Sequence, residues 1–172
     1  MEKLCMPTVA VIIENQDKTK ILMQRRRKTT DQLYSGVMEI PGGRLRAFEH
    51  VVEGIKREVR EETGLELTKI EGLITEPMKG PNGEQVIAFK PFCGEQILNG
   101  EQPWVGFVFI GKAKGKPRAS KENEMPQWLS LEEVQKLIDR KEVFWYHAQV
   151  LQTYLNERKE SGVHEQDKKE KN

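Results

Sequence analysis

The segment REVREETG, residues 57–64, places three glutamates on one face of a predicted helix. Glu58, Glu61 and Glu62 are three and four residues apart, so their side chains are neighbours on a helix. A like-charged pair at this spacing costs about 0.2–0.5 kcal/mol. A solvated helix with ion pairs, such as Arg57 with Glu61, is the simpler interpretation, but it leaves the repulsion between Glu58 and Glu62 unexplained.

The helix that carries these acids is predicted over residues 50–63. Val52, Ile55 and Val59 are spaced to form one buried stripe, and Gly64 is a typical residue at a helix C-terminus. The turn Pro41-Gly42-Gly43 lies just upstream, and glycine lets the backbone approach a ligand closely.

Three carboxylates on adjacent helical turns predict a site for a hard divalent cation. Mg²⁺ prefers oxygen ligands and usually binds one or two carboxylates together with water and substrate phosphates. Arg57 lies among the acids, and its planar guanidinium group is suited to orienting a carboxylate.

The rest of the chain alternates predicted strands with helices. Strands are predicted at residues 7–13, 20–25, 38–45, 65–74, 84–93 and 104–113. A polar loop at 111–127 precedes a strand end and a helix that reaches residue 140, for which Ser130 and Glu133 predict a capping box. A last helix carries Phe144, His147, Val150, Leu151, Tyr154 and Leu155. This order predicts an α/β fold with a mixed sheet and helices on both faces.

Length and composition predict one domain. The chain has 172 residues, which favours a single domain at residues 1–158 and a charged, disordered tail at 159–172. The net charge of +1 favours neither nucleic acid nor an anionic membrane as a partner. Two cysteines, Cys5 and Cys93, form no disulfide framework, which fits the cytoplasm. The oligomeric state stays open, with a homodimer among the alternatives.

The acidic segment is part of a longer pattern. Gly43 is followed after five residues by Glu49 and, after seven more, by REVREETGL. This pattern resembles the signature of the Nudix hydrolases, of the MutT-like kind, over residues 43–65. Phe48 departs from it, because the family commonly has glycine before the first glutamate.

The resemblance implies a Nudix α/β/α sandwich with a mixed central sheet, in which the signature forms a loop, a helix and a loop. It also implies Mg²⁺-dependent hydrolysis, with Mn²⁺ as an alternative metal, of a phosphoanhydride bond in a nucleoside diphosphate linked to another group. The implied metal-site residues are Glu58, Glu61, Glu62, Gly43 and Glu49. Arg25 and Gly42 are implied in substrate binding, Glu58 and Arg57 in catalysis, and Glu122 or Glu124 as a general base outside the signature.

The substrate is a small-molecule nucleotide whose identity stays open at this point. The segment MEIPGG resembles the branch that cleaves nucleoside triphosphates, which we favour slightly. Pro81, sixteen residues beyond Leu65, resembles a spacing seen in enzymes that cleave ADP-ribose. A non-catalytic nucleotide-binding regulator would not need all three glutamates, and removal of RNA caps would need a basic surface.

Several other residues favour structural roles. His147 lies on a helix with a core-like pattern, where a packed histidine is more common than a catalytic one. Trp104, Trp128 and Trp145 could stack on a nucleobase, although core packing is the expected role for most of them.

Overall fold

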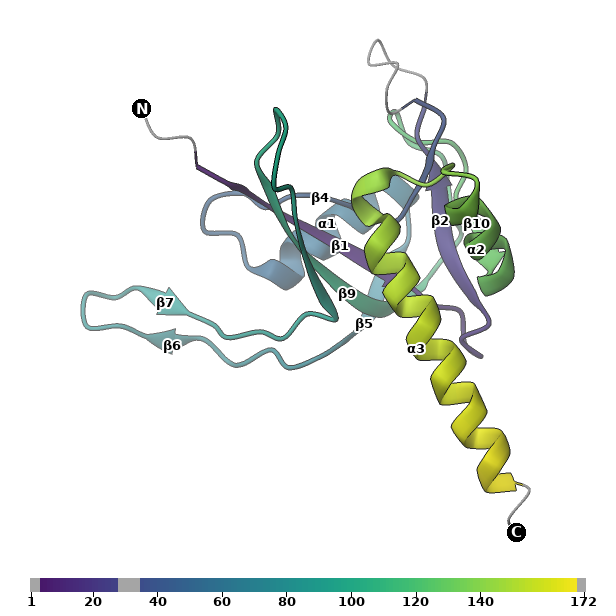
Figure 1. Cartoon of the computed structure of the whole chain (residues 1–172). Helices are drawn as coiled ribbons and strands as arrows, with labels where there is room; N and C mark the ends of the chain where they lie inside the picture. Colours follow the sequence, from purple (N-terminus) through teal and green to yellow (C-terminus); the bar gives the residue numbers. More distant parts are fainter. Residues whose placement is uncertain (1–3, 28–34, 170–172) are drawn as a thin grey trace.

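The computed structural model describes residues 4–27 and 35–169. Its main sheet is built on two long strands, β1 (Met6–Ile13) and β9 (Trp104–Lys114), which pair in parallel. Strand β4 (Gly42–Arg44) pairs antiparallel with β1, while β5 (Glu66–Glu71) and β8 (Cys93–Gln96) pair antiparallel with β9. The sheet is therefore mixed, as the sequence predicted (Figure 1).

A second, antiparallel sheet has the order β10-β2-β3. Its strands are β10 (Gln127–Ser130), β2 (Lys20–Arg25) and β3 (Met38–Glu39). The predicted strand at 38–45 is thus divided by Pro41 between two sheets. The first part pairs with β2 and the second, as β4, with β1.

Helices cover both faces of the main sheet because β1 is apolar on both sides. Helix α1 (Val51–Thr63) packs with Val9, Val11 and Ile13 of β1. The intervening residues Ala10 and Ile12 pack in a second core with α2 (Leu131–Asp139) and α3 (Trp145–Lys169). Alternate residues of a strand face opposite sides, so one apolar strand supports both cores.

The helix ends follow the sequence closely. His50 caps the N-terminus of α1, and Gly64 ends it with a φ of 72°, which suits glycine. The capping box of Ser130 and Glu133 at α2 is confirmed. Within α1 the fully buried stripe begins at Val51 instead of Val52, which is only partly buried.

The prediction of one strand over 84–93 is wrong. The segment is divided: Gln85–Val86 forms the short strand β7, which pairs with β6 (Met78–Lys79) in a hairpin that extends away from the main sheet (Figure 1). The next strand, β8, starts after Pro91, which has no N–H for a ladder. The apolar pattern that suggested a strand comes from Ile87 and Phe89, which pack against the α1 core.

Helix α3 continues to Lys169, so the backbone is helical within much of the segment 159–172. Residues 170–172 lie outside the described part of the chain. The boundary at residue 158 and the disorder of the tail therefore stay predictions.

Within residues 4–27 and 35–169, no helix combines the length and apolar character needed to span a membrane.

Candidate active site

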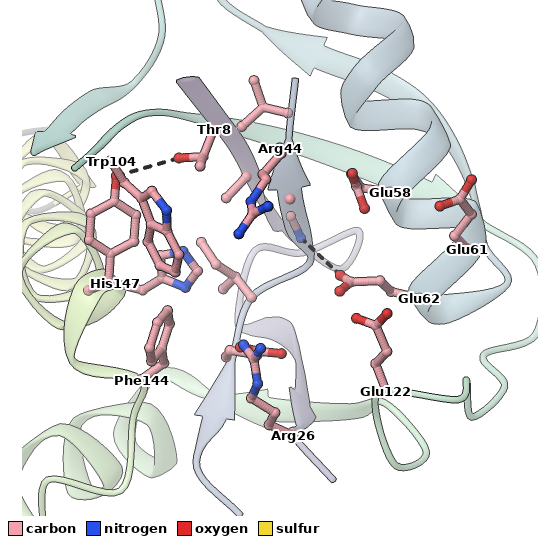
Figure 2. A pocket seen from close by; sticks show the side chains of 17 residues that line it. Thr8, Arg26, Arg44, Glu58, Glu61, Glu62, Trp104, Glu122, Phe144 and His147 are labelled. Carbon is pink, nitrogen blue, oxygen red and sulfur yellow. Dashed lines mark hydrogen bonds and ion pairs between the residues drawn. The ribbon is translucent and has the colours of Figure 1, made fainter. Parts of the chain in front are cut away.

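A cavity of about 500 Å³ lies over the β1 and β4 edge of the main sheet. Its chemistry differs between its two ends, as Figure 2 shows: four carboxylates, those of Glu58, Glu61, Glu62 and Glu122, face three labelled rings across the cavity. Arg26 and Arg44 lie between the two groups. The aromatic wall consists of Trp104, Phe144, Tyr146 and His147.

Arg57 fixes the loop before α1 onto the helix. Its guanidinium donates to both carboxylate oxygens of Glu49, at 2.8 and 2.9 Å, and also to Glu58. A further bond, of 3.1 Å, reaches the backbone oxygen of Arg44. The hydrogen bonds from Arg57 are the main reason that the pKa of Glu49 falls to about 2. The expected pairing of Arg57 with Glu61 is present at 3.7 Å.

The two glycines of the entry turn make room for the acids. A Cβ atom on Gly43 would lie 2.4 Å from the carboxylate of Glu58, so only glycine permits this approach. Gly42 packs equally closely on β1, where a Cβ would lie 2.5 Å from the backbone oxygen of Val9. The Gly42 N–H donates to Glu62 at 3.0 Å.

Glu62 is enclosed by hydrogen-bond donors. Besides Gly42, the side-chain amides of Gln24 and Asn123 donate to it, at 2.8 and 3.3 Å. Burial, followed by the charge of Glu39, raises the pKa of Glu62 to about 8. Burial also raises the pKa of Glu39, against the effect of Arg26, which lies 3.2 Å from it. Arg26 therefore does not offset the effects of burial and of the neighbouring negative charge on the pKa values of Glu62 and Glu39.

The two proposed loop bases lie in different places. Glu122 lines the cavity with the three signature glutamates, whereas Glu124 lines a separate cavity with Arg25 and Arg27. The Glu124 N–H is bonded to the backbone oxygen of Arg25 at 2.8 Å, which holds this part of the loop beside the end of β2. Glu122 therefore lies with the signature glutamates, and Glu124 does not.

A similar choice concerns the arginines at the end of β2. Arg25 donates to the backbone oxygen of Gly36 and lines a separate cavity, while Arg26 lines the site cavity. Neighbouring residues on an extended chain face opposite sides, so only one of the two can face the cavity. Arg26, and not Arg25, therefore lines this cavity, and the role of Arg25 in substrate binding stays a prediction.

The aromatic wall consists of interlocking rings from β9 and the start of α3. The centroids of Trp104 and Tyr146 lie 5.5 Å apart, as do those of Phe144 and His147. His147 is buried, and burial lowers its pKa to about 4. Among the described residues, its Nδ1 and the Nε1 of Trp104 are buried polar atoms without a hydrogen-bond partner.

Sequence reasoning missed several charged and aromatic residues of the cavity. Arg26, Glu39, Arg44, Phe144 and Tyr146 line it, but none belongs to a linear motif with the three glutamates. The arginine triplet 25–27, with its alternating directions on a strand, was the available signal for Arg26.

Comparison with known proteins shows the family to which the chain belongs. The model of the NUDIX domain matches residues 6–154. The chain belongs to the Nudix hydrolase family. The Nudix fold is shared with the MutT protein of Methanosarcina mazei Go1, with a TM-score of 0.64 and 23% identity over 92% of this chain and 99% of that one. It is also shared with the E. coli ORF135 protein, with a TM-score of 0.62 and 23% identity over 90% and 91% of the two chains.

A curated Nudix relative is the human 8-oxo-dGDP phosphatase NUDT18. It is 26% identical over 114 residues, which are 66% of this chain. The aligned part of the chain spans 27% of the length of that relative.

The departure of Phe48 from the Nudix signature has a structural explanation. Its φ is 61°, in the left-handed region that glycine adopts without strain, and its side chain is fully exposed. The backbone at Phe48 therefore adopts the conformation that a glycine would favour at this position.

The carboxylates also fit the divalent cations that Nudix hydrolases generally use. Their donors are all oxygen, which suits a hard cation, and Glu58, Glu61 and Glu62 line one cavity. Within the described residues, no three His, Cys, Asp or Glu side chains converge closely enough to hold an ion as they stand.

Proposed function

We propose that this protein hydrolyses a phosphoanhydride bond of a nucleotide with the help of Mg²⁺ or Mn²⁺. The observation that carries the proposal is the division of one cavity into a carboxylate end and an aromatic end. A nucleotide has the same division, because its phosphates are charged and its base has an apolar face that stacks on aromatic rings.

Glu58, Glu61 and Glu62 would hold the metal, supported by Glu49 and by the backbone at Gly43. When bound, the metal would neutralise phosphate oxygens and lower the pKa of a bound water molecule. Arg57 acts through other residues: it holds Glu49 and Glu58 in place.

Glu122 is the proposed general base. It lines the carboxylate end, is exposed, and would take a proton from the attacking water. Arg26 and Arg44 are placed to bind phosphate oxygens between the carboxylates and the rings, since a guanidinium group suits such oxygens. Gly42 contributes by packing on β1 and by its bond to Glu62.

We propose a nucleoside triphosphate as the preferred substrate. It reacts with one water molecule to give a nucleoside monophosphate and pyrophosphate. The ADP-ribose alternative rested on Pro81, which lies in the turn of the β6–β7 hairpin and does not line the cavity. The relative named as an 8-oxo-dGDP phosphatase makes oxidised guanine nucleotides a further candidate.

A non-catalytic regulator is the competing function. The four carboxylates at one end of the cavity argue against it, because binding alone does not require them. We expect the enzyme to act in the cytoplasm, on the basis of its two free cysteines.

The test is a hydrolysis screen with Mg²⁺, Mn²⁺ or a chelator. The panel includes nucleoside di- and triphosphates, their 8-oxo-guanine forms, ADP-ribose and dinucleoside polyphosphates. We expect metal-dependent release of pyrophosphate from a triphosphate. Binding of nucleotides without turnover of any member of the panel would favour the regulator.

A further inference from the structure

The carboxylate end of the site opens onto a second cavity of about 570 Å³. Glu58, Glu61, Glu62 and Glu122 line both cavities. The second cavity is completed by residues 118–121 of the loop that follows β9. The carboxylates are therefore the boundary between two spaces, instead of the closed end of one.

The far wall of the second cavity is basic and polar. Arg118, Ser120 and Lys121 line it, and none of its described lining residues is aromatic. The first cavity ends in four rings, so the two spaces are suited to different parts of a substrate. A phosphate group matches the second wall, whereas a second nucleobase would have no ring on which to stack.

The loop that carries this wall is held in place by α1. The Arg118 N–H donates to the backbone oxygen of Thr63 at 2.8 Å. The Arg118 side chain crosses Gly64 so closely that a Cβ there would lie 2.4 Å from its Cγ. Ser120 Oγ accepts the N–H groups of Glu122 and Asn123, at 3.2 and 2.9 Å. The basic residues are thus positioned by the same helix that carries the glutamates.

The opposite charges face one another without direct pairing. Within the described residues, neither Arg118 nor Lys121 forms an ion pair within 4.0 Å of a carboxylate oxygen. An anion that also contacts a metal held by the glutamates would fill the intervening space and offset both groups of charges.

We propose that the second cavity binds the phosphate chain of the leaving group, with Arg118 and Lys121 as its ligands. This inference rests on the proposed function. It extends that function by assigning the nucleoside to the aromatic cavity and the departing pyrophosphate to the basic one. It favours nucleoside triphosphates over ADP-ribose and dinucleoside polyphosphates, whose leaving groups carry a sugar or a second nucleoside.

The experiment measures binding of inorganic pyrophosphate with Mg²⁺ by calorimetry, alongside kcat and KM for the substrate panel. The variants are Arg118→Ala, Lys121→Ala and the double substitution, with Lys116→Ala as the matched control on the same loop. Lys116 is exposed and lies outside the lining of the cavity. Lys121→Ala is informative by itself, because Arg118 also packs on Gly64 and its loss could affect folding.

We expect each single substitution to weaken pyrophosphate binding about tenfold, as for loss of a charged hydrogen bond. We expect the control to bind as the wild type does. KM for a triphosphate should rise with the same variants, with an unchanged unfolding midpoint for Lys121→Ala.

Equal pyrophosphate affinity in the wild type and the double variant would overturn the proposal, as would no binding to the wild type. An equal loss with Lys116→Ala would also overturn it, because the effect would then be one of net charge. If pyrophosphate binding weakens as expected but no nucleotide is hydrolysed, the proposed function fails while this subsite stands.

Discussion

Glu62 accepts the backbone N–H of Gly42 at 3.0 Å, which joins the last turn of α1 to the first residue of β4. The bond connects both ends of the segment between the entry turn and the end of the helix. Because backbone groups are fixed by the sheet, this contact positions the carboxylate more firmly than a side-chain partner could. The bond thus ties the turn just before the signature to the last turn of the signature helix.

Glu61→Gln and Glu62→Gln should each reduce kcat by roughly a hundredfold, because each removes a charge proposed to stabilise the reacting phosphate through the metal. Steady-state kinetics with the best substrate from the screen would measure this. Glu53→Gln is the matched control, since Glu53 is on the same helix but pairs with Lys56. Wild-type rates in either site variant would contradict the ligand assignment.

Glu122→Gln and Glu124→Gln should differ sharply. We expect the first to lower kcat about 10²-fold or more, as for loss of a general base, and the second to leave kcat unchanged. The reason is that only Glu122 lines the cavity with the signature glutamates. A pH–rate profile would accompany the measurement, and equal modest effects of both changes would point to a base within the signature.

The raised pKa of Glu62 predicts a pH dependence of stability in metal-free protein. Its pKa is about 8 when folded and about 4.5 in its ordinary state, so the folded chain holds a proton that the unfolded chain releases. The contribution of Glu62 to the free energy of unfolding is fully present below about pH 4.5 and is lost as the pH rises to about 8. The free energy of unfolding should therefore fall, by at most about 1.4 kcal/mol per pH unit from this group.

Urea unfolding between pH 5 and 8.5, with a chelator present, would measure this loss. Glu95, whose pKa burial also raises to about 8, contributes in the same window, so the comparison is between the wild type and Glu62→Gln. The variant should show the shallower decline. Parallel curves would show that Glu62 does not hold its proton.

Phe48→Gly should be more stable than Phe48→Ala by about 1 kcal/mol. The positive φ at this position strains any residue with a Cβ, and the fully exposed ring makes little packing contribution to lose. Urea midpoints of the two variants would measure the difference. Equal stability would mean that the loop relaxes to a negative φ once the ring is removed.

The sequence was most informative where one segment makes its own structure. The helix at α1, its glycine cap and the capping box at α2 depend on residues within a few positions, and each was predicted closely. The division of 84–93 was missed because Ile87 and Phe89 look like strand residues but are apolar for packing. A local pattern does not distinguish these two causes.

The sequence by itself determined the family and the three glutamates on one helical face, because their spacing is enough to bring them together. Only the tertiary structure decided what surrounds them. In the folded chain, Arg26 lines the cavity and Arg25 does not, and Glu122 lines it and Glu124 does not. Trp104 and Phe144, from distant segments, form part of the opposite wall. The physical reason is that such neighbours meet through sheet pairing and helix packing, which no spacing along the chain encodes.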